Sequence, residues 1–524
     1  MDSECQAIGR TARTLLLGQQ PSWGARMSEP AGFYFYDLET SGRDPRWHRI
    51  LQFAGVRTDA QLNPLEDPLV LRGRLPEEVL PEVEAMVVTG LAPATVTHGL
   101  GEAELAERIF SATGDASMCL TGYNSVRFDD EFLRFSYYRS LLEPYARERR
   151  GGSRFDLLDL ARATRALRPE GMQWPTDDDG LPSTRLTSLA AANGIEHLAA
   201  HDAVSDVLAT VGLAQRLRAS QPRLFDYAVS LRVRRTLESM LTPGKEPIVH
   251  VSGRIPRERR CLALMSSLAR HPRNARGYIV FDLDQDPREF EQLDEDELHR
   301  RIFTANDQLA VERLRIKEIR TNKAPFVAEL VAVRKEDADR LHLDIDAAIA
   351  RHRWLRARPE FVRRMVRAFS RDTFVHQDVD ADAALYDNLI NDREQLLAAQ
   401  LRADPSAPPG QPFADARLNT LWTRFRARNW PDLQTAEERH AWTQWVCARL
   451  RGDVGDAVSI SQFVHELQRV RARDGDSPLL SEWADYGRAL AARLELSWPD
   501  PLPLAGSIDQ SRGIGTAPTS VETP

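Results

Sequence analysis

Two acidic side chains stand two residues apart at the end of an aromatic-rich segment. The segment GFYFYDLE, residues 32–39, has the composition of a buried strand and ends with Asp37 and Glu39. Because side chains alternate across a strand, both carboxylates lie on one face and close together. Their negative charges repel unless a cation neutralises them, and oxygen ligands favour Mg²⁺ or Mn²⁺ over zinc. The pair predicts a divalent metal site, although two solvated acids at a strand end would have the same spacing.

A third candidate acid lies in the segment GYNSVRFDDEFL. Asp129 follows Phe128 at the start of an expected helix over residues 129–143, where the positive end of the helix dipole favours an acid. An acid there also fits a helix cap, which is the better explanation of this segment taken alone. Asp130 is adjacent and easily confused with Asp129, but the candidate is the residue directly after Phe128.

The segment HDAVSD supplies a histidine and a fourth acid. If a helix begins at Asp202, His201 lies on the loop that enters it and can lean over the site. Asp206 then lies on the first turns of the helix with its carboxylate directed inward. Taken alone, the segment is better explained by Asp202 as an ordinary cap and Asp206 as a solvated helix acid.

The three segments together have a recognisable order. D-x-E, then N-x-x-x-F-D, then H-x₄-D, all within one α/β domain, resembles the DEDDh exonucleases, a superfamily of 3′→5′ nucleases with an RNase-H-like fold. The resemblance implies two Mg²⁺ ions, for which Mn²⁺ can substitute, and His201 as the general base. It also implies four metal ligands, namely Asp37, Glu39, Asp129 and Asp206. The chemistry fits, because histidine titrates near neutral pH and metal ions stabilise the oxygens that attack and leave phosphorus.

The similarity extends over roughly residues 32–495. Four segments resemble the bacterial exodeoxyribonuclease I family: SRFDLLDLARATRALRPEGMQWP, QPRLFDY, LVAVRKEDADRL and RFRARNWP. This resemblance implies a 3′→5′ exonuclease that degrades single-stranded DNA to 5′-mononucleotides in DNA repair and recombination. It further implies an SH3-like α+β domain and a C-terminal helical domain that close a positively charged channel over the DNA.

The same resemblance implies contacts outside the acidic cluster. Glu39 and Arg168 are placed among the substrate-binding residues. The acidic, hydrophobic C-terminal tail of single-stranded-DNA-binding protein is expected to dock on Arg168 and Tyr227, with Arg334 as a weaker candidate. Purely local structural contacts of these side chains are the alternative.

The elements that must position the site follow from the hydrophobic pattern. Strand-like segments interleaved with helical ones predict an α/β domain with a mixed sheet and flanking helices, which closes with a helix from about residue 201 to 219. Its expected strands are 32–39, 50–59, 65–74 and 119–124, and its other expected helices are 102–112 and 129–143. Later segments are β-like (248–253, 278–284 and 325–333), and the pattern is helical from about 337. The predicted divisions are an extension (1–30), the nuclease domain (31–220), the SH3-like domain (221–372), the helical domain (373–500) and a tail (501–524).

Arginines and aromatic residues alternate between residues 351 and 371. This stretch holds eight arginines and one acid, Glu360, interleaved with Trp354, Phe361 and Phe369. Arginine neutralises phosphates and aromatic rings stack on bases, so the stretch could line a channel for single-stranded nucleic acid. An amphipathic helix with core aromatics and solvated arginines has the same pattern. A second basic cluster comprises Arg254, Arg257, Arg259 and Arg260.

Composition sets the remaining limits. The chain has 524 residues, which suggests about three domains, and its net charge of −8 argues against a uniformly basic nucleic-acid coat. Four cysteines without a CxxC pair exclude a cysteine-built zinc site and fit the reducing cytoplasm. We expect no membrane association and a monomer. Two other functions stay open: a DEDDh nuclease acting on RNA ends, which the long region after the nuclease domain disfavours, and an inactive single-strand-binding relative.

Overall fold

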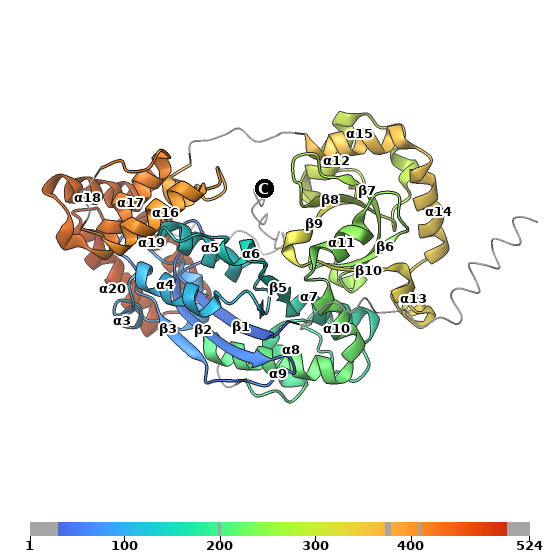
Figure 1. The fold of residues 1–524 in the computed structure, drawn as a ribbon, viewed down its shortest axis with the longest axis horizontal. Helices are drawn as coiled ribbons and strands as arrows, with labels where there is room; N and C mark the ends of the chain where they lie inside the picture. The colour runs from blue at the N-terminus through green and yellow to red at the C-terminus, as the bar shows by residue number, and fades with distance from the viewer. Residues whose placement is uncertain (1–29, 198–200, 372–378, 407–409, 500–524) are drawn as a thin grey trace, which may run out of the picture.

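The computed structural model describes residues 30–197, 201–371, 379–406 and 410–499 (Figure 1). The predicted extension (apart from Pro30) and the predicted tail lie outside these residues. A first sheet lies at the base of the molecule, and two lobes rise from it, one built on a second sheet and one of helices alone. Among the described residues, no helix is both long and apolar enough to cross a membrane.

The first sheet has five strands in the order β3-β2-β1-β4-β5. β1 pairs antiparallel with β2 and parallel with β4, so the sheet is mixed, as predicted. β2 also pairs antiparallel with β3, and β4 pairs parallel with β5. The strands are β1 (Gly32–Thr40), β2 (Ile50–Asp59), β3 (Leu69–Arg72), β4 (Met118–Gly122) and β5 (Ser153–Asp156).

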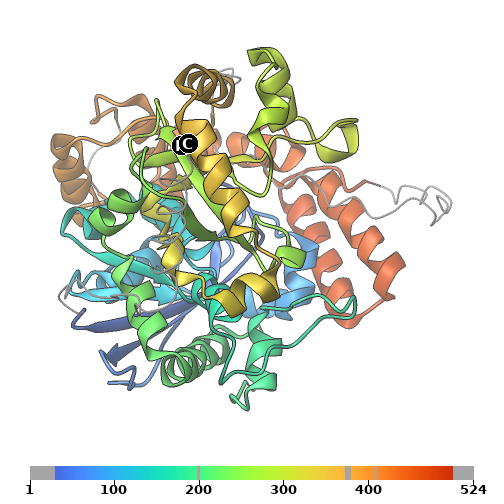
Figure 2. The same ribbon diagram turned by 90° about the vertical axis from the view of Figure 1, so that its right-hand side faces the viewer.

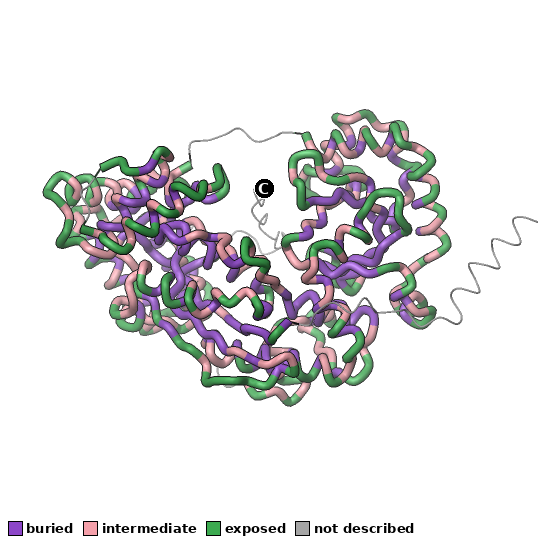
Figure 3. Tube along the Cα trace, in the orientation of Figure 1, coloured by how far each residue is buried: buried purple, intermediate pink, exposed green. Residues whose placement is uncertain are grey.

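Helices cover both faces of this sheet. On one face Tyr34 and Tyr36 of β1 pack with residues of α4 (Glu102–Thr113) and α5 (Asp129–Arg139). On the other face Phe33 and Phe35 pack with residues of two further helices; these are α7 (Leu157–Leu167) and α9 (Ala203–Ser220). β1 is therefore buried on both sides, and Figure 3 shows it in the colour of buried residues. Shorter helices of this region are α2 (Val83–Thr89), α3 (Pro93–Val96), α6 (Ala146–Arg149), α8 (Leu186–Ala192), α10 (Pro222–Ser230) and α11 (Arg234–Leu241).

The second sheet is entirely antiparallel, in the order β10-β6-β7-β8-β9. Its lobe faces the viewer in Figure 2, and its core is continuous with that of the first sheet. The strands are β6 (Ile248–Val251), β7 (Leu262–Arg270), β8 (Gly277–Asp282), β9 (Ile316–Arg320) and β10 (Phe326–Glu329). The helices are α12 (Glu295–Phe303), α13 (Lys335–Leu341), α14 (Ile345–Arg356) and α15 (Pro359–Ser370).

The helical lobe packs on the domain built around the first sheet, here called the first domain, through an apolar cluster and a buried ionic cluster. In the ionic cluster, Arg428 Nε donates to Glu78 Oε1 at 2.7 Å and Arg449 NH2 donates to the carbonyl of Trp47 at 2.8 Å. Asp382 is completely buried and pairs with Arg49 of the first domain and with Arg424 of the helical lobe. The lobe comprises α16 (Asp392–Ala403), α17 (Ala416–Asn429), α18 (Ala436–Arg451), α19 (Ile460–Asp474) and α20 (Pro478–Arg493).

Candidate active site

The carboxyl end of β1 presents the first two candidate acids. Asp37 is half-buried and Glu39 is buried, and both lie on the face of β1 that α9 covers. On the neighbouring strand Glu39 pairs with Gln52, after which the register shifts and the regular ladder ends. The two carboxylates therefore stand side by side where the strand opens toward the start of α9.

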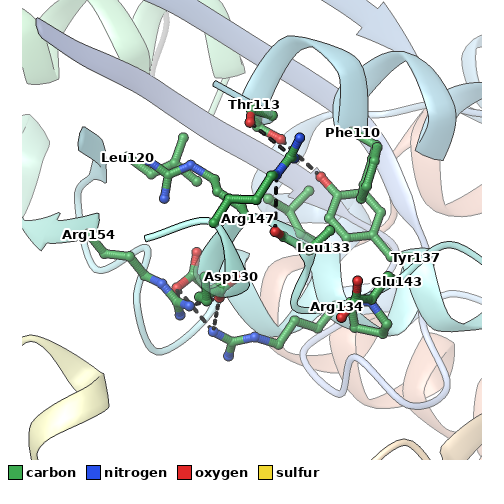
Figure 4. Close-up of a pocket in the computed structure, with 15 residues that line it drawn as sticks. Phe110, Thr113, Leu120, Asp130, Leu133, Arg134, Tyr137, Glu143, Arg147 and Arg154 are labelled. Carbon is green, nitrogen blue, oxygen red and sulfur yellow. Dashed lines mark hydrogen bonds and ion pairs between the residues drawn. The ribbon is translucent and has the colours of Figure 1, made fainter. Parts of the chain in front are cut away.

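The structure separates Asp129 from its neighbour Asp130. Asp129 begins α5, and its Oδ1 accepts a hydrogen bond from the backbone N–H of Leu38 at 3.0 Å. This bond places Asp129 against β1, between the two acids of that strand. Asp130 turns away, toward a small pocket (Figure 4), where it accepts from Tyr36 and from Arg154, each at 2.6 Å.

The loop before α9 brings His201 to the acids. Asp202 caps the helix, as expected, and also accepts from Gln52 of β2 at 3.0 Å. His201 adopts a left-handed backbone conformation, with φ of 62°. One ligand atom each of Glu39, His201 and Asp206 lies within 4.8 Å of the others. Residues from three separate segments thus converge at the end of β1.

A second histidine at the site was missed by the sequence analysis. His197 Nε2 makes a close hydrogen-bonded contact with Asp206 Oδ1, and the histidine side chain is buried. The segment HLAAHD contains two histidines, and only the second stands at the spacing of the H-x₄-D motif. Spacing alone gave no signal for the first, whose contact with Asp206 depends on the tertiary fold.

The acids raise one another's pKa values. Burial, and then the negative charges of Asp129 and Asp206, hold the pKa of Asp37 well above its usual range. Burial together with the charges of Asp37 and Asp206 raises the pKa of Glu39 to about 9. The pKa of Asp129 is also raised well above its usual range, chiefly by burial. A divalent cation would relieve this repulsion, and hard carboxylate oxygens suit Mg²⁺ or Mn²⁺, so the residues present fit the implied metal.

This electrostatic strain predicts a pH-dependent stability. A folded-state pKa of about 9 for Glu39 means that the folded protein holds a proton that the unfolded chain releases above its ordinary pKa. Without metal, the contribution of Glu39 to stability should therefore fall from about pH 4.5 to about pH 9, by up to about 1.4 kcal/mol per pH unit. Thermal unfolding in EDTA and in Mg²⁺ measures this, and the stabilisation by Mg²⁺ should grow with pH. A metal-free melting temperature that rises over this range would contradict the assignment.

Two of the three expected tail-binding residues meet at one buried acid, Asp337. Arg168 NH1 and Arg334 Nε contact Asp337 Oδ2 at 2.8 and 3.0 Å. The Tyr227 hydroxyl donates to the carbonyl of Val327 in β10 at 2.8 Å. Arg168 and Arg334 are therefore brought together at Asp337, and all three side chains have structural partners.

Many arginines of the two basic stretches form ion pairs with acids, whereas a solvated channel wall would present them to the solvent. Phe361 is buried, and Trp354 packs on it with ring centroids 5.9 Å apart. Four arginines of the 351–371 stretch form ion pairs with acids of the same lobe (Arg358 with Glu291, Arg363 with Glu360, Arg367 with Glu295 and Arg371 with Asp296). In the second cluster Arg257 and Arg259 pair with Asp177 and Asp282. The core explanation of Trp354 and Phe361 is therefore the better one.

Comparison with known families matches three consecutive regions of the chain. Residues 34–214 match an exonuclease family model, residues 232–371 the exonuclease I SH3-like domain, and residues 379–490 the exonuclease I C-terminal domain. Exodeoxyribonuclease I of Escherichia coli K12 is 38% identical over 420 residues, which cover 79% of this chain and 88% of that protein.

Solved structures agree with these matches. An exonuclease I from Methylocaldum szegediense aligns with a TM-score of 0.82 and 38% identity, covering 88% of this chain and 99% of the other. The zinc-bound form of an E. coli exonuclease I–single-stranded DNA complex aligns with a TM-score of 0.83 and 34% identity, covering 88% of this chain and 99% of the other. With its acidic cluster, its three matched regions and this agreement in fold, the chain belongs to the exodeoxyribonuclease I family.

Proposed function

We propose that this protein degrades single-stranded DNA from the 3′ end and releases 5′-mononucleotides through a site that holds two Mg²⁺ ions, for which Mn²⁺ can substitute. The observation that carries the proposal is the convergence of carboxylates and His201 at the end of β1. The relative solved with single-stranded DNA and a bound metal supports the substrate class and the need for a divalent ion.

Each residue of the site has a role in this proposal. The metal ligands are Asp37, Glu39, Asp129 and Asp206, and Glu39 also borders the substrate. Bound Mg²⁺ supplies positive charge that neutralises the phosphodiester and lowers the pKa of water. His201, exposed at the mouth of the site, accepts the proton that the attacking water loses. His197 orients the Asp206 carboxylate through its hydrogen bond.

The two lobes are proposed to form the walls of a channel for one DNA strand. We assign residues 31–220 to the nuclease domain, 221–372 to the SH3-like domain and 373–500 to the helical domain. Arginines not paired with acids are proposed to contact phosphates, so DNA binding should weaken steeply with salt despite the net charge of −8.

The direction of digestion tests this function. Four labelled substrates are compared: a single-stranded oligonucleotide, the same strand with a 3′-phosphate, one blocked at its 5′ end and one whose single strand leads to a duplex junction. Mg²⁺-dependent release of mononucleotides should require a free 3′-hydroxyl and should stall at a duplex junction, because a narrow channel admits one strand. Degradation that ignores the 3′ block but respects the 5′ block would refute the proposal. An equivalent RNA substrate tests the RNA alternative, and binding without cleavage would identify an inactive relative.

We also propose that the chain is a monomer and that it binds the C-terminal tail of single-stranded-DNA-binding protein around Arg168, Tyr227 and Arg334. The supporting observation is that the two arginines of this set meet at Asp337. A peptide with the acidic, hydrophobic tail should bind Arg168→Ala about tenfold or more weakly than the wild type. Arg340→Ala is the matched control, because Arg340 also pairs with Asp337, at 3.0 Å. Equal losses in both variants would mean that Arg168 acts only through the local fold, and sedimentation tests the oligomeric state.

A further inference from the structure

The first turn of α5 carries three consecutive acids that face three different places. Asp129 faces β1, and Asp130 accepts from Tyr36 and Arg154. Glu131 has a different set of partners, and its own side chain is only 15% exposed. A carboxylate this enclosed must be compensated by its own partners.

Glu131 receives donors from the two outer domains. Lys323 Nζ lies 2.6 Å from Glu131 Oε1, and the Tyr386 hydroxyl donates to Oε2. Lys323 lies in the region that matches the SH3-like domain, and Tyr386 in the region that matches the C-terminal domain. Glu131 itself lies in the region that matches the exonuclease model. One carboxylate, two residues from Asp129, therefore joins all three regions.

Local structure holds both donors in place. Lys323 ends a short 3₁₀ turn, η4 (Thr321–Lys323), and the chain then turns through Ala324, whose φ of 44° is left-handed. Tyr386 packs edge-on against Phe135 of α5, with ring centroids 5.8 Å apart. The short 3₁₀ turn before Tyr386, η6 (Ala381–Ala383), contains the completely buried Asp382 of the ionic cluster. Lys323 is thus positioned by the fold of its own domain, and Tyr386 by the packing of the helical domain on the nuclease domain.

Arg134 connects Glu131 to the rest of the first turn. Its NH1 lies 2.6 Å from Glu131 Oε1, and its NH2 lies 3.8 Å from Asp130 Oδ2. Asp130 is in turn bound to β1 and β5 through Tyr36 and Arg154. A displacement of Glu131 would therefore be transmitted to the turn that presents Asp129.

We propose that Glu131 is a positioning residue that holds Asp129 in its metal-binding position only when both outer domains are docked on it. The inference rests on the proposed function, because it requires Asp129 to be a metal ligand. It makes the docking of the SH3-like and helical domains a condition for an assembled catalytic site, in addition to any role in holding DNA.

Removal of the two donors tests this proposal in the full-length protein. Lys323→Met and Tyr386→Phe, singly and together, are compared with the wild type by calorimetric titration with Mn²⁺ in the absence of DNA, and by kcat and KM on a single-stranded oligonucleotide. Each variant should lower Mn²⁺ affinity and kcat by about 3- to 10-fold, somewhat less than the loss of a group that touches a metal ligand directly. KM should stay within about twofold, because the DNA-binding surfaces are unchanged.

Asp392→Asn is the matched control. It removes the ion pair between Arg149 and Asp392, whose charged atoms lie 2.8 Å apart. This pair also joins the nuclease and C-terminal regions, but the Asp392 side chain is 86% exposed. Such an exposed pair contributes little, so this variant should behave as the wild type.

The outcomes distinguish failure of the positioning role from failure of the proposed function. Unchanged Mn²⁺ affinity and kcat in the double variant would overturn the positioning role, even if its melting temperature fell, because the contacts would then only hold the domains together. Glu131→Gln provides a second test if the double variant does not fold, with the same expected losses. A wild-type protein that fails to degrade single-stranded DNA would instead refute the proposed function.

Discussion

Asp37→Ala and Asp206→Ala are each expected to lower kcat by about 10³-fold or more, since each removes a carboxylate that neutralises charge at the reacting phosphate. Affinity for single-stranded DNA, measured in EDTA by fluorescence anisotropy, should stay within about threefold, because phosphate contacts elsewhere supply most of it. The two residues come from different elements, β1 and α9, so equal effects would report a shared metal site.

Asp59→Asn is the control for these variants. Asp59 of β2 lies at the opposite end of the same sheet, where it pairs with Gly32 of β1, and its carboxylate accepts hydrogen bonds from Gln61 and Asn63 of the local turn. It should retain full activity. Near-normal turnover in either Asp37→Ala or Asp206→Ala would refute the metal-ligand assignment.

His201→Ala should lower kcat by about 10²–10⁴-fold, the usual contribution of a positioned general base. The acid limb of the pH–rate profile should flatten, because the group that must be unprotonated to accept the proton of water is then missing. Turnover of a single-stranded oligonucleotide in saturating Mg²⁺, followed from acid to alkaline pH, measures both effects.

His197→Gln distinguishes the two histidines. His197 touches Asp206 as well, but we assign it an orienting role, so its replacement should slow the reaction and keep the acid limb. If His197→Gln removed the limb and His201→Ala preserved it, the general base would be His197.

Strong hydrophobic patterns predicted the central elements well. The aromatic run of β1 and the apolar run of β2 are buried over nearly their whole length, so their composition identified them. β5 (Ser153–Asp156) was missed because it is short and begins with polar residues, and only pairing with β4 makes it a strand. In the second sheet, the segment 325–333 was predicted as one strand, but the structure ends β10 at Glu329 and continues as a 3₁₀ turn.

The site was predictable as a set of residue types and much less so as a set of contacts. Motif spacing singled out Asp129 over Asp130, and the Leu38 N–H accounts for that choice in physical terms. Spacing could not reveal His197 or the partners of Glu131, because these contacts join segments that only the tertiary fold brings together. Apolar spacing also could not separate stacking rings from core rings, and the structure places Phe361 in the core.

The ionic cluster between the nuclease and helical domains has a consequence for biosynthesis. Arg449 donates to the carbonyl of Trp47, which is 402 residues earlier in the chain. At about 5–20 residues per second, a ribosome needs roughly 20 to 80 s to make that intervening stretch. Until Arg428 is made, Arg49 is the arginine of the nuclease domain that pairs with Glu78, and the shorter ion pair with Arg428 is still missing. Full activity should therefore appear only after synthesis of nearly the whole chain, and a ribosome stalled before Arg424 should carry an unfinished enzyme.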